Sequence, residues 1–409
     1  MAEPPTPLNF RQVLAIAPLR RLWIAQLVSI LGDFLAVFAV FAVATFRFHA
    51  TPAEISLILV SYLLPFAMVS PPAGVMVDRW NLKRTMITSD LVRSLLALTL
   101  VWATDLGQIY AIFFALSSVS SFFVPAQSVA LRTLVPQHGL MAANALMSQA
   151  IQVTQIVSPA IAGILVDRAG PNFCYWFDAA SFVFSAAMVA LIPLHRESAT
   201  GHRNLGSLTA EMTTGLKFIF THSAISFVMI SMTVGMFAIR CFGALLAVWV
   251  RDVLAAGSSQ FGVLNSLIGI GMICGTQLVH RFARKHSADR LVVFGLLAAG
   301  AFIMLPAAAG TMAATVVGML GLGFGVVFIF IPAQTLLQTV TPMNMLGRVS
   351  SSLMSSLAFT QVIALSLTGW GAQVIGIRNL YFASAGMLVL IAAAGWRRNA
   401  LTPSSQAPA

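Results

Sequence analysis

The sequence predicts an all-α membrane protein with twelve transmembrane helices in two pseudo-symmetric six-helix bundles, and three observations carry this prediction. First, the 409 residues are 58% hydrophobic and 9% charged, against about 25% charged residues in an ordinary soluble domain. Second, apolar runs of the length that a bilayer requires, about 20 residues, recur along the whole chain. Third, short motifs repeat between the two halves at an offset of about 206 residues.

The predicted spans are apolar runs bounded by charged residues or by Pro and Gly clusters. They are expected at residues 22–46, 54–77, 86–104, 107–131, 141–166, 172–194, 224–250, 259–280, 290–309, 311–338, 347–375 and 379–396.

The longest polar stretch divides these spans into six and six. Within it, apolar residues from Leu208 to Ile219 recur at three- to four-residue spacing, which is typical of a helix lying at the membrane surface. The domains expected are an N-terminal bundle at 1–194, a cytoplasmic linker with an interfacial helix at 195–222, a C-terminal bundle at 223–396 and a disordered cytoplasmic tail at 397–409.

The internal repeat is clearest after the fourth span of each half. Pro125-Ala126-Gln127 is echoed by Pro332-Ala333-Gln334. Two parallel repeats imply a substrate site near the membrane midplane, where the halves meet.

The distribution of basic residues predicts the orientation. Of the 23 Lys and Arg residues, 17 fall in segments that are cytoplasmic if the N-terminus is inside, and four fall outside. We therefore expect a bacterial-type inner membrane protein with both termini on the cytoplasmic side.

The net charge of +11 is spread between apolar runs rather than over one polar face, so the membrane and not a nucleic acid is the expected partner. A monomer is expected.

The loop between the second and third spans carries Gly74, Asp78, Arg79 and Lys83 in the order G-x-x-x-D-R-x-x-x-K. This motif resembles the loop signature G-x-x-x-D-R-x-G-R-K of the major facilitator superfamily, with Asn81 and Leu82 in place of Gly and Arg. The resemblance implies a latch that closes the cytoplasmic side in the outward-facing state. Gly74 would allow close helix approach. The alternative is ordinary anchoring of basic residues at the cytoplasmic surface, which leaves Asp78 unexplained.

Further motifs resemble the macrolide-efflux and enterobactin-exporter branch of that superfamily. They are Gly32-Asp33, Pro125-Ala126-Gln127, Ala143-Asn144-Ala145-Leu146, Phe177-Asp178-Ala179 and Gly347-Arg348-Val349. Two features depart from the family's proton antiporters: the fifth span has Ser158-Pro159 and Ala162-Gly163 in place of G-P and G-G, and the fourth span lacks a central Arg.

Two ionisable residues lie near the middle of predicted spans, where a charge costs at least roughly 2.5–3.5 kcal/mol. Asp33 in the first span is our candidate for proton coupling, and Arg240 in the seventh is a candidate for binding substrate or for pairing with Asp33. The alternative is structural: Asp33 caps a helix break at Gly32, and Arg240 extends toward the membrane surface or bonds to carbonyl groups.

Other polar residues within the predicted spans are weaker candidates for functional sites. Asp90 and Arg93 share a helix face and are predicted to form a structural ion pair, with substrate contact as the alternative. Asp178 is expected at a packing position. Gln152 and Gln361 are candidates for substrate binding, although such amides also join helices.

The expected function follows from the resemblance and from what the chain lacks. No nucleotide-binding, zinc-protease or hydrolase motif occurs, so we expect neither an enzyme nor a bound cofactor or metal. The resemblance implies a secondary transporter that exports a small amphipathic molecule, such as a drug, macrolide or siderophore-like metabolite, in exchange for protons. The alternatives are an importer or a lysolipid flippase on the same fold, and more remotely a membrane scaffold or enzyme.

Overall fold

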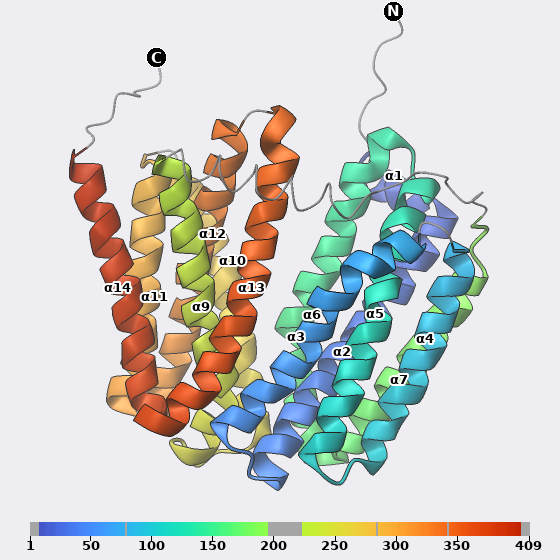
Figure 1. The fold of residues 1–409 in the computed structure, drawn as a ribbon, viewed down its shortest axis with the longest axis horizontal. Helices are drawn as coiled ribbons and strands as arrows, with labels where there is room; N and C mark the ends of the chain where they lie inside the picture. Colours follow the sequence, from blue (N-terminus) through green and yellow to red (C-terminus); the bar gives the residue numbers. More distant parts are fainter. Residues whose placement is uncertain (1–7, 78–79, 195–222, 284, 342, 402–409) are drawn as a thin grey trace, which may run out of the picture. The chain divides into compact units, whose positions relative to one another are not determined.

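A computed structural model describes residues 8–77, 80–194, 223–283, 285–341 and 343–401, and within these ranges the chain is helical with no strand (Figure 1). The first half contains α1 Phe10–Ala15, α2 Ala17–Ala42, a π-helical turn Val43–Arg47, α3 Pro52–Val77, α4 Leu82–Thr99, a 3₁₀ turn Leu100–Trp102, α5 Leu106–Leu134, a 3₁₀ turn Gln137–Gly139, α6 Leu140–Ala169 and α7 Pro171–Ala190. The second half contains α9 Ser223–Asp252, α10 Ser258–Ala283, α11 Ala288–Ala309, α12 Met312–Val340, α13 Met343–Ile375 and α14 Ile377–Leu401.

The membrane character of these helices follows from their length and composition. In the described parts of the chain, 11 helices are long and apolar enough to cross a membrane, and α13 contributes a shorter apolar segment, Phe359–Ile375. These helices correspond to the expected spans, and the all-α membrane fold class is confirmed.

Local sequence explains several helix ends. Asn81 and Asp105 cap the starts of α4 and α5, because their side chains accept the backbone N–H three residues ahead. Gly170, at a φ of 80°, ends α6, and Pro171 then opens α7 at the helix position that does not need an N–H.

Two boundaries differ from those expected. The short helix α1 was not predicted, and its start is stabilised by a capping box between Asn9 and Gln12. Helix α14 continues to Leu401, so the first residues of the expected disordered tail at 397–409 are helical. Arg397 ends the apolar run, yet a basic residue near the C-terminal end of a helix is favourable because it complements the helix dipole. The predicted linker, 195–222, lies outside the described residues.

The chain forms two compact units. Unit 1 comprises Met1–Ala50, Leu57–His202 and Gly257–Val263, and unit 2 comprises Thr51–Ser56, Arg203–Ala256 and Leu264–Ala409. Each unit therefore includes the start of one helix whose remainder belongs to the other.

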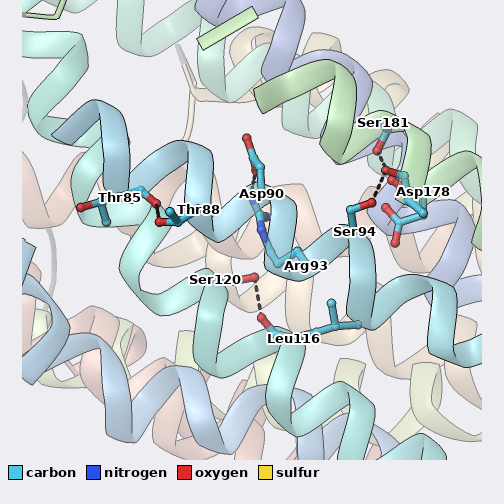
Figure 2. Close-up of polar contacts among 10 residues, drawn as sticks. Thr85, Thr88, Asp90, Arg93, Ser94, Leu116, Ser120, Asp178 and Ser181 are labelled. Carbon is cyan, nitrogen blue, oxygen red and sulfur yellow. Dashed lines mark hydrogen bonds and ion pairs between the residues drawn. The ribbon is translucent and has the colours of Figure 1, made fainter. Parts of the chain in front are cut away.

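In unit 1, α7 is the central packing partner, because both α2 and α4 pack along it. Gly32 makes this approach possible. A Cβ atom at this position would lie 3.0 Å from the Cα of Asp178 and 2.8 Å from its Oδ1, so only glycine lets α2 come so close to α7. On the other side, the Ser94 hydroxyl of α4 donates a 2.9 Å hydrogen bond to the carbonyl of Ala179 (Figure 2).

In unit 2, α11 packs on α12 and α14, and α9 packs on α12, α13 and α14. Aromatic side chains fill the contact between α9 and α14: the Tyr381 ring lies 4.5 Å from that of Phe242 and 5.3 Å from that of Trp249, centroid to centroid. Their polar atoms are satisfied, since Tyr381 donates to the Phe242 carbonyl and Trp249 donates to Thr315. This contact is a hydrophobic core with internal hydrogen bonds.

Candidate functional site

The ionisable side chains inside unit 1 come from four helices and interact with one another. Asp33 of α2 interacts electrostatically with Arg93 and Asp90 of α4, and Asp178 of α7 interacts with Asp33 and Arg93. Tyr62 of α3 interacts with Asp33, Arg93 and Asp178. We call Asp33, Asp90 and Asp178, together with Arg93 and Tyr62, the carboxylate cluster.

Arg93 is the cation of this cluster, and its position is held from three sides. Its guanidinium forms a hydrogen-bonded ion pair with Asp90, three residues earlier on α4 (Figure 2). The guanidinium carbon also lies 4.4 Å from the ring centroid of Phe123 and 4.3 Å from that of Phe182. Both members of the pair are buried, with exposed fractions of 0% for Asp90 and 5% for Arg93. Aromatic faces on two sides provide cation–π stabilisation away from water.

Asp178 is a buried carboxylate that forms no ion pair among the described residues. It is 1% exposed, and its Oδ1, like the Oδ2 of Asp90, has no hydrogen-bond partner among the described residues. The Ser181 hydroxyl next to it donates to the backbone carbonyl of Asp178, at 2.7 Å. Because Gly32 packs against Asp178, the neighbouring Asp33 is brought into electrostatic range of it.

The arrangement has an imbalance of charge. If all three carboxylates were ionised, Arg93 would compensate one of them and two negative charges would remain inside the bundle. Unpaired charges in a low-dielectric interior are costly. Uptake of protons removes the imbalance, so the cluster is chemically suited to bind and release protons. Within the described residues, no group of three His, Cys, Asp or Glu side chains is arranged to hold a metal ion.

The predicted substrate-binding residues lie on three other helices. Gln152 is exposed on α6 in unit 1, while Arg240 on α9 and Gln361 on α13 belong to unit 2. Arg240 is exposed and forms no ion pair with any residue that the structure describes. It precedes Cys241, which is buried between α9 and α13 and accepts a hydrogen bond from Thr368. The pairing of Asp33 with Arg240 stays a prediction.

The predicted latch is only partly described. Asp78 and Arg79 lie outside the described residues, whereas Lys83 lies in the first turn of α4. Gly74 does not show the close helix approach that was expected, because no described heavy atom lies within 4 Å of the position its Cβ would take. Asn81, where the family signature has Gly, caps α4 by accepting the N–H of Arg84 at 3.0 Å. Its side-chain oxygen performs a role that Gly cannot.

The sequence alone did not reveal the cluster as a unit. Asp178 was expected to be a packing residue, Asp90 and Arg93 were expected to form a structural ion pair, and Tyr62 was not singled out. The signal available was that Asp178 is a carboxylate within an apolar span, which is costly unless it has a role.

The fold and the cluster suggest a transporter, and comparison with known proteins identifies the family. The sequence model of the Major Facilitator Superfamily matches residues 22–360. The chain belongs to the major facilitator superfamily. As a facilitator it is a multi-pass membrane transport protein and not an enzyme, and it is expected to bind a small-molecule substrate.

Curated relatives align with most of the length of this facilitator. It is 27% identical over 377 residues to the uncharacterised MFS-type transporter YfiS of Bacillus subtilis, covering 90% of this chain and 89% of the relative. It is 24% identical over 383 residues to macrolide efflux protein A of Streptococcus pyogenes, covering 91% and 93%. It is also 24% identical over 332 residues to the lysophospholipid transporter LplT of Photorhabdus laumondii, covering 80% and 81%.

Solved structures agree on the fold. A mutant of the nucleoside transporter NupG superposes with a TM-score of 0.75 at 13% identity, covering 93% of this facilitator and 99% of NupG. At this identity the likeness concerns the fold and not the substrate.

Proposed function

We propose that this facilitator exports a small amphipathic organic molecule, such as a drug, macrolide or siderophore-like metabolite, from the cytoplasm in exchange for protons. The carboxylate cluster is the observation that carries the proposal, because three carboxylates, two of them fully buried, share one cation in the membrane-spanning part of unit 1. Similarity to a macrolide efflux protein supports the direction of transport. The excess of basic residues in alternate loops supports a bacterial-type inner membrane location with both termini cytoplasmic.

In this proposal Asp33 is the residue that couples protons to transport. It is half-buried, in contrast to the fully buried Asp90 and Asp178, so it is the carboxylate of the cluster that protons reach most readily from outside the bundle. Proton binding removes negative charge from the cluster, and proton release restores it. The cost of that charge biases the bundle toward one conformation over the other, which is the requirement for coupling.

Substrate contacts are assigned to Arg240, Gln152 and Gln361, and conformational latching to Gly74, Asp78, Arg79 and Lys83. Arg240 is exposed and lacks an ion-pair partner in the described chain, which supports a role toward an external ligand. Lys83 in the first turn of α4 supports the latch only through its place in the motif.

A lysolipid flippase is the second candidate, because LplT is a lysophospholipid transporter and aligns with 80% of this chain. Both activities require an amphipathic substrate, so the cluster does not separate them. The two activities are distinguished by which compound the protein transports.

The test measures transport into everted membrane vesicles energised by a proton gradient. A panel of fluorescent amphipathic compounds and a fluorescent lysophosphatidylethanolamine are offered to the wild type, Asp33→Asn and Asp105→Asn. Asp105 is the matched control because it is exposed, and Asn retains its role as cap of α5.

We expect uptake by the wild type and by Asp105→Asn that a protonophore abolishes, and at least a tenfold loss in Asp33→Asn. Equal protonophore-sensitive uptake by Asp33→Asn would refute the role of Asp33. Uptake confined to the lysolipid would replace drug export by lipid flipping.

A further inference from the structure

A cleft of about 550 Å³ opens on unit 1 between the start of α4 and the middle of α5, and no member of the carboxylate cluster lines it. Its polar lining includes Asn81, Arg84 and Thr88, and its apolar lining includes Trp80, Val92 and Phe122. None of the described carboxylates lines it, and none of them is ion-paired with Arg84. The described lining is therefore amphipathic, and the charge that it carries is positive.

The polar groups gather at the beginning of the α4 span. Asn81 uses its side-chain oxygen to accept the N–H of Arg84, which leaves its amide nitrogen as a donor at the cleft. The Thr88 hydroxyl donates to the carbonyl of Arg84, one turn back (Figure 2 shows Thr88 on α4). This end offers a guanidinium and an amide N–H₂ group to an anion.

The apolar groups form a wall that continues toward the interior of the span. The rings of Trp80 and Phe122 stack with centroids 5.7 Å apart and an angle of 13° between their planes. Trp80 is 45% exposed just ahead of the span that begins at Leu82, which is where tryptophan is favoured at a membrane surface. Val92 lies nearly three turns further along α4, at greater depth in the span.

We propose that this cleft binds an anionic phospholipid, with the phosphate at Arg84 and Asn81 and an acyl chain along Phe122 and Val92. The order of the lining matches the order of a lipid, with charge at the membrane surface and apolar contacts below it. The predicted orientation places this end of α4 at the cytoplasmic leaflet, whose anionic lipids favour basic pockets between helices. A lipid bound here touches the helix that carries Asp90 and Arg93.

The experiment measures lipid binding to the purified full-length chain in detergent by native mass spectrometry. Dioleoylphosphatidylglycerol is titrated against the wild type, Arg84→Gln and Arg132→Gln, with dioleoylphosphatidylcholine as the neutral lipid. Arg132 is the matched control, because it is an exposed arginine near the end of α5 that does not line the cleft. The proposal predicts that Arg84→Gln weakens phosphatidylglycerol binding about fivefold and that Arg132→Gln changes it little.

A second variant keeps the proposal testable if Arg84→Gln does not fold. Asn81→Asp retains a side chain that caps α4, yet places a carboxylate beside the lipid phosphate, and it is expected to weaken binding at least as much as Arg84→Gln. Equal losses in Arg84→Gln and Arg132→Gln would mean general surface attraction and would overturn the site. Wild-type affinity in Arg84→Gln and Asn81→Asp would also overturn it, as would complete displacement of the lipid by millimolar inorganic phosphate, which would identify an anion site without lipid specificity.

Discussion

The two units contain comparable numbers of transmembrane helices but bury different chemistry. In unit 1, α2, α4 and α7 enclose three carboxylates and an arginine held between Phe123 and Phe182. In unit 2, α9 and α14 enclose aromatic rings, the Tyr381 hydroxyl and the Trp249 indole N–H donate to the Phe242 carbonyl and the Thr315 hydroxyl, and the ionisable Arg240 is exposed. The two halves therefore share a helical arrangement, but different kinds of side chain are buried inside them. The carboxylates that the proposal uses for proton coupling therefore lie in unit 1, and the comparison can be tested by matched substitutions.

The largest effect is expected from removing the central cation of unit 1. Arg93→Gln leaves buried carboxylates without their counter-ion, which costs about 3–5 kcal/mol of stability when one partner of a buried pair is removed. Arg240→Gln is the matched change in unit 2 and is expected to cost less than about 1 kcal/mol, because Arg240 is exposed. Unfolding of the detergent-solubilised proteins, followed by the fluorescence of a thiol-reactive dye, measures both. Equal destabilisation by the two variants would contradict the comparison.

The packing that brings the carboxylates together is tested at Gly32. Gly32→Val forces α2 away from Asp178 and is expected to cost about 1–3 kcal/mol. Gly74→Ala, on α3, has open space and is expected to stay within about 0.5 kcal/mol of the wild type. Thermal unfolding and transport are measured together, since separation of α2 from α7 also separates Asp33 from Asp178. A neutral Gly32→Val would show that the two helices do not need this contact.

Asp178 is expected to contribute to coupling and not only to packing. Asp178→Asn preserves the shape of the side chain but removes one of the three negative charges, and we expect about a tenfold loss of proton-driven transport, equivalent to roughly 1.4 kcal/mol. Vesicle uptake is measured over a series of imposed pH gradients. Asp252→Asn is the control, because this carboxylate of unit 2 pairs with Arg251 and is exposed. If uptake by Asp178→Asn depended on the pH gradient as wild-type uptake does, Asp178 would have only a packing role.

The smallest effect is expected from single hydrogen bonds within each unit. Ser94→Ala removes the bond from α4 to the Ala179 carbonyl in unit 1, and Thr315→Val removes the acceptor of the Trp249 indole N–H in unit 2. Each is expected to cost about 1 kcal/mol. Only Ser94→Ala is expected to alter transport, because only it holds the helix that carries Arg93. Loss of transport in Thr315→Val at equal stability would show that unit 2 shares in coupling.

Some residues of the carboxylate cluster could be predicted from the sequence, and others could not. Asp33 and the pair of Asp90 and Arg93 were identified because charges within apolar spans are rare and because residues three apart share a helix face. Asp178 was found but assigned to packing, and Tyr62 was not found. A phenol in an apolar run is unremarkable by composition, and its neighbours lie on helices distant in sequence.

The membrane fold followed from the sequence alone, because bilayer thickness fixes the length of an apolar run and loop charges record orientation one segment at a time. Both are local properties that each segment displays by itself. The carboxylate cluster and the amphipathic cleft emerged only from helix packing. Their members come from different helices, and whether Asp33, Arg93 and Asp178 meet depends on how each helix is rotated about its axis and how closely its neighbours approach. A single glycine, Gly32, governs that approach between α2 and α7, and its effect is visible only where the two helices touch.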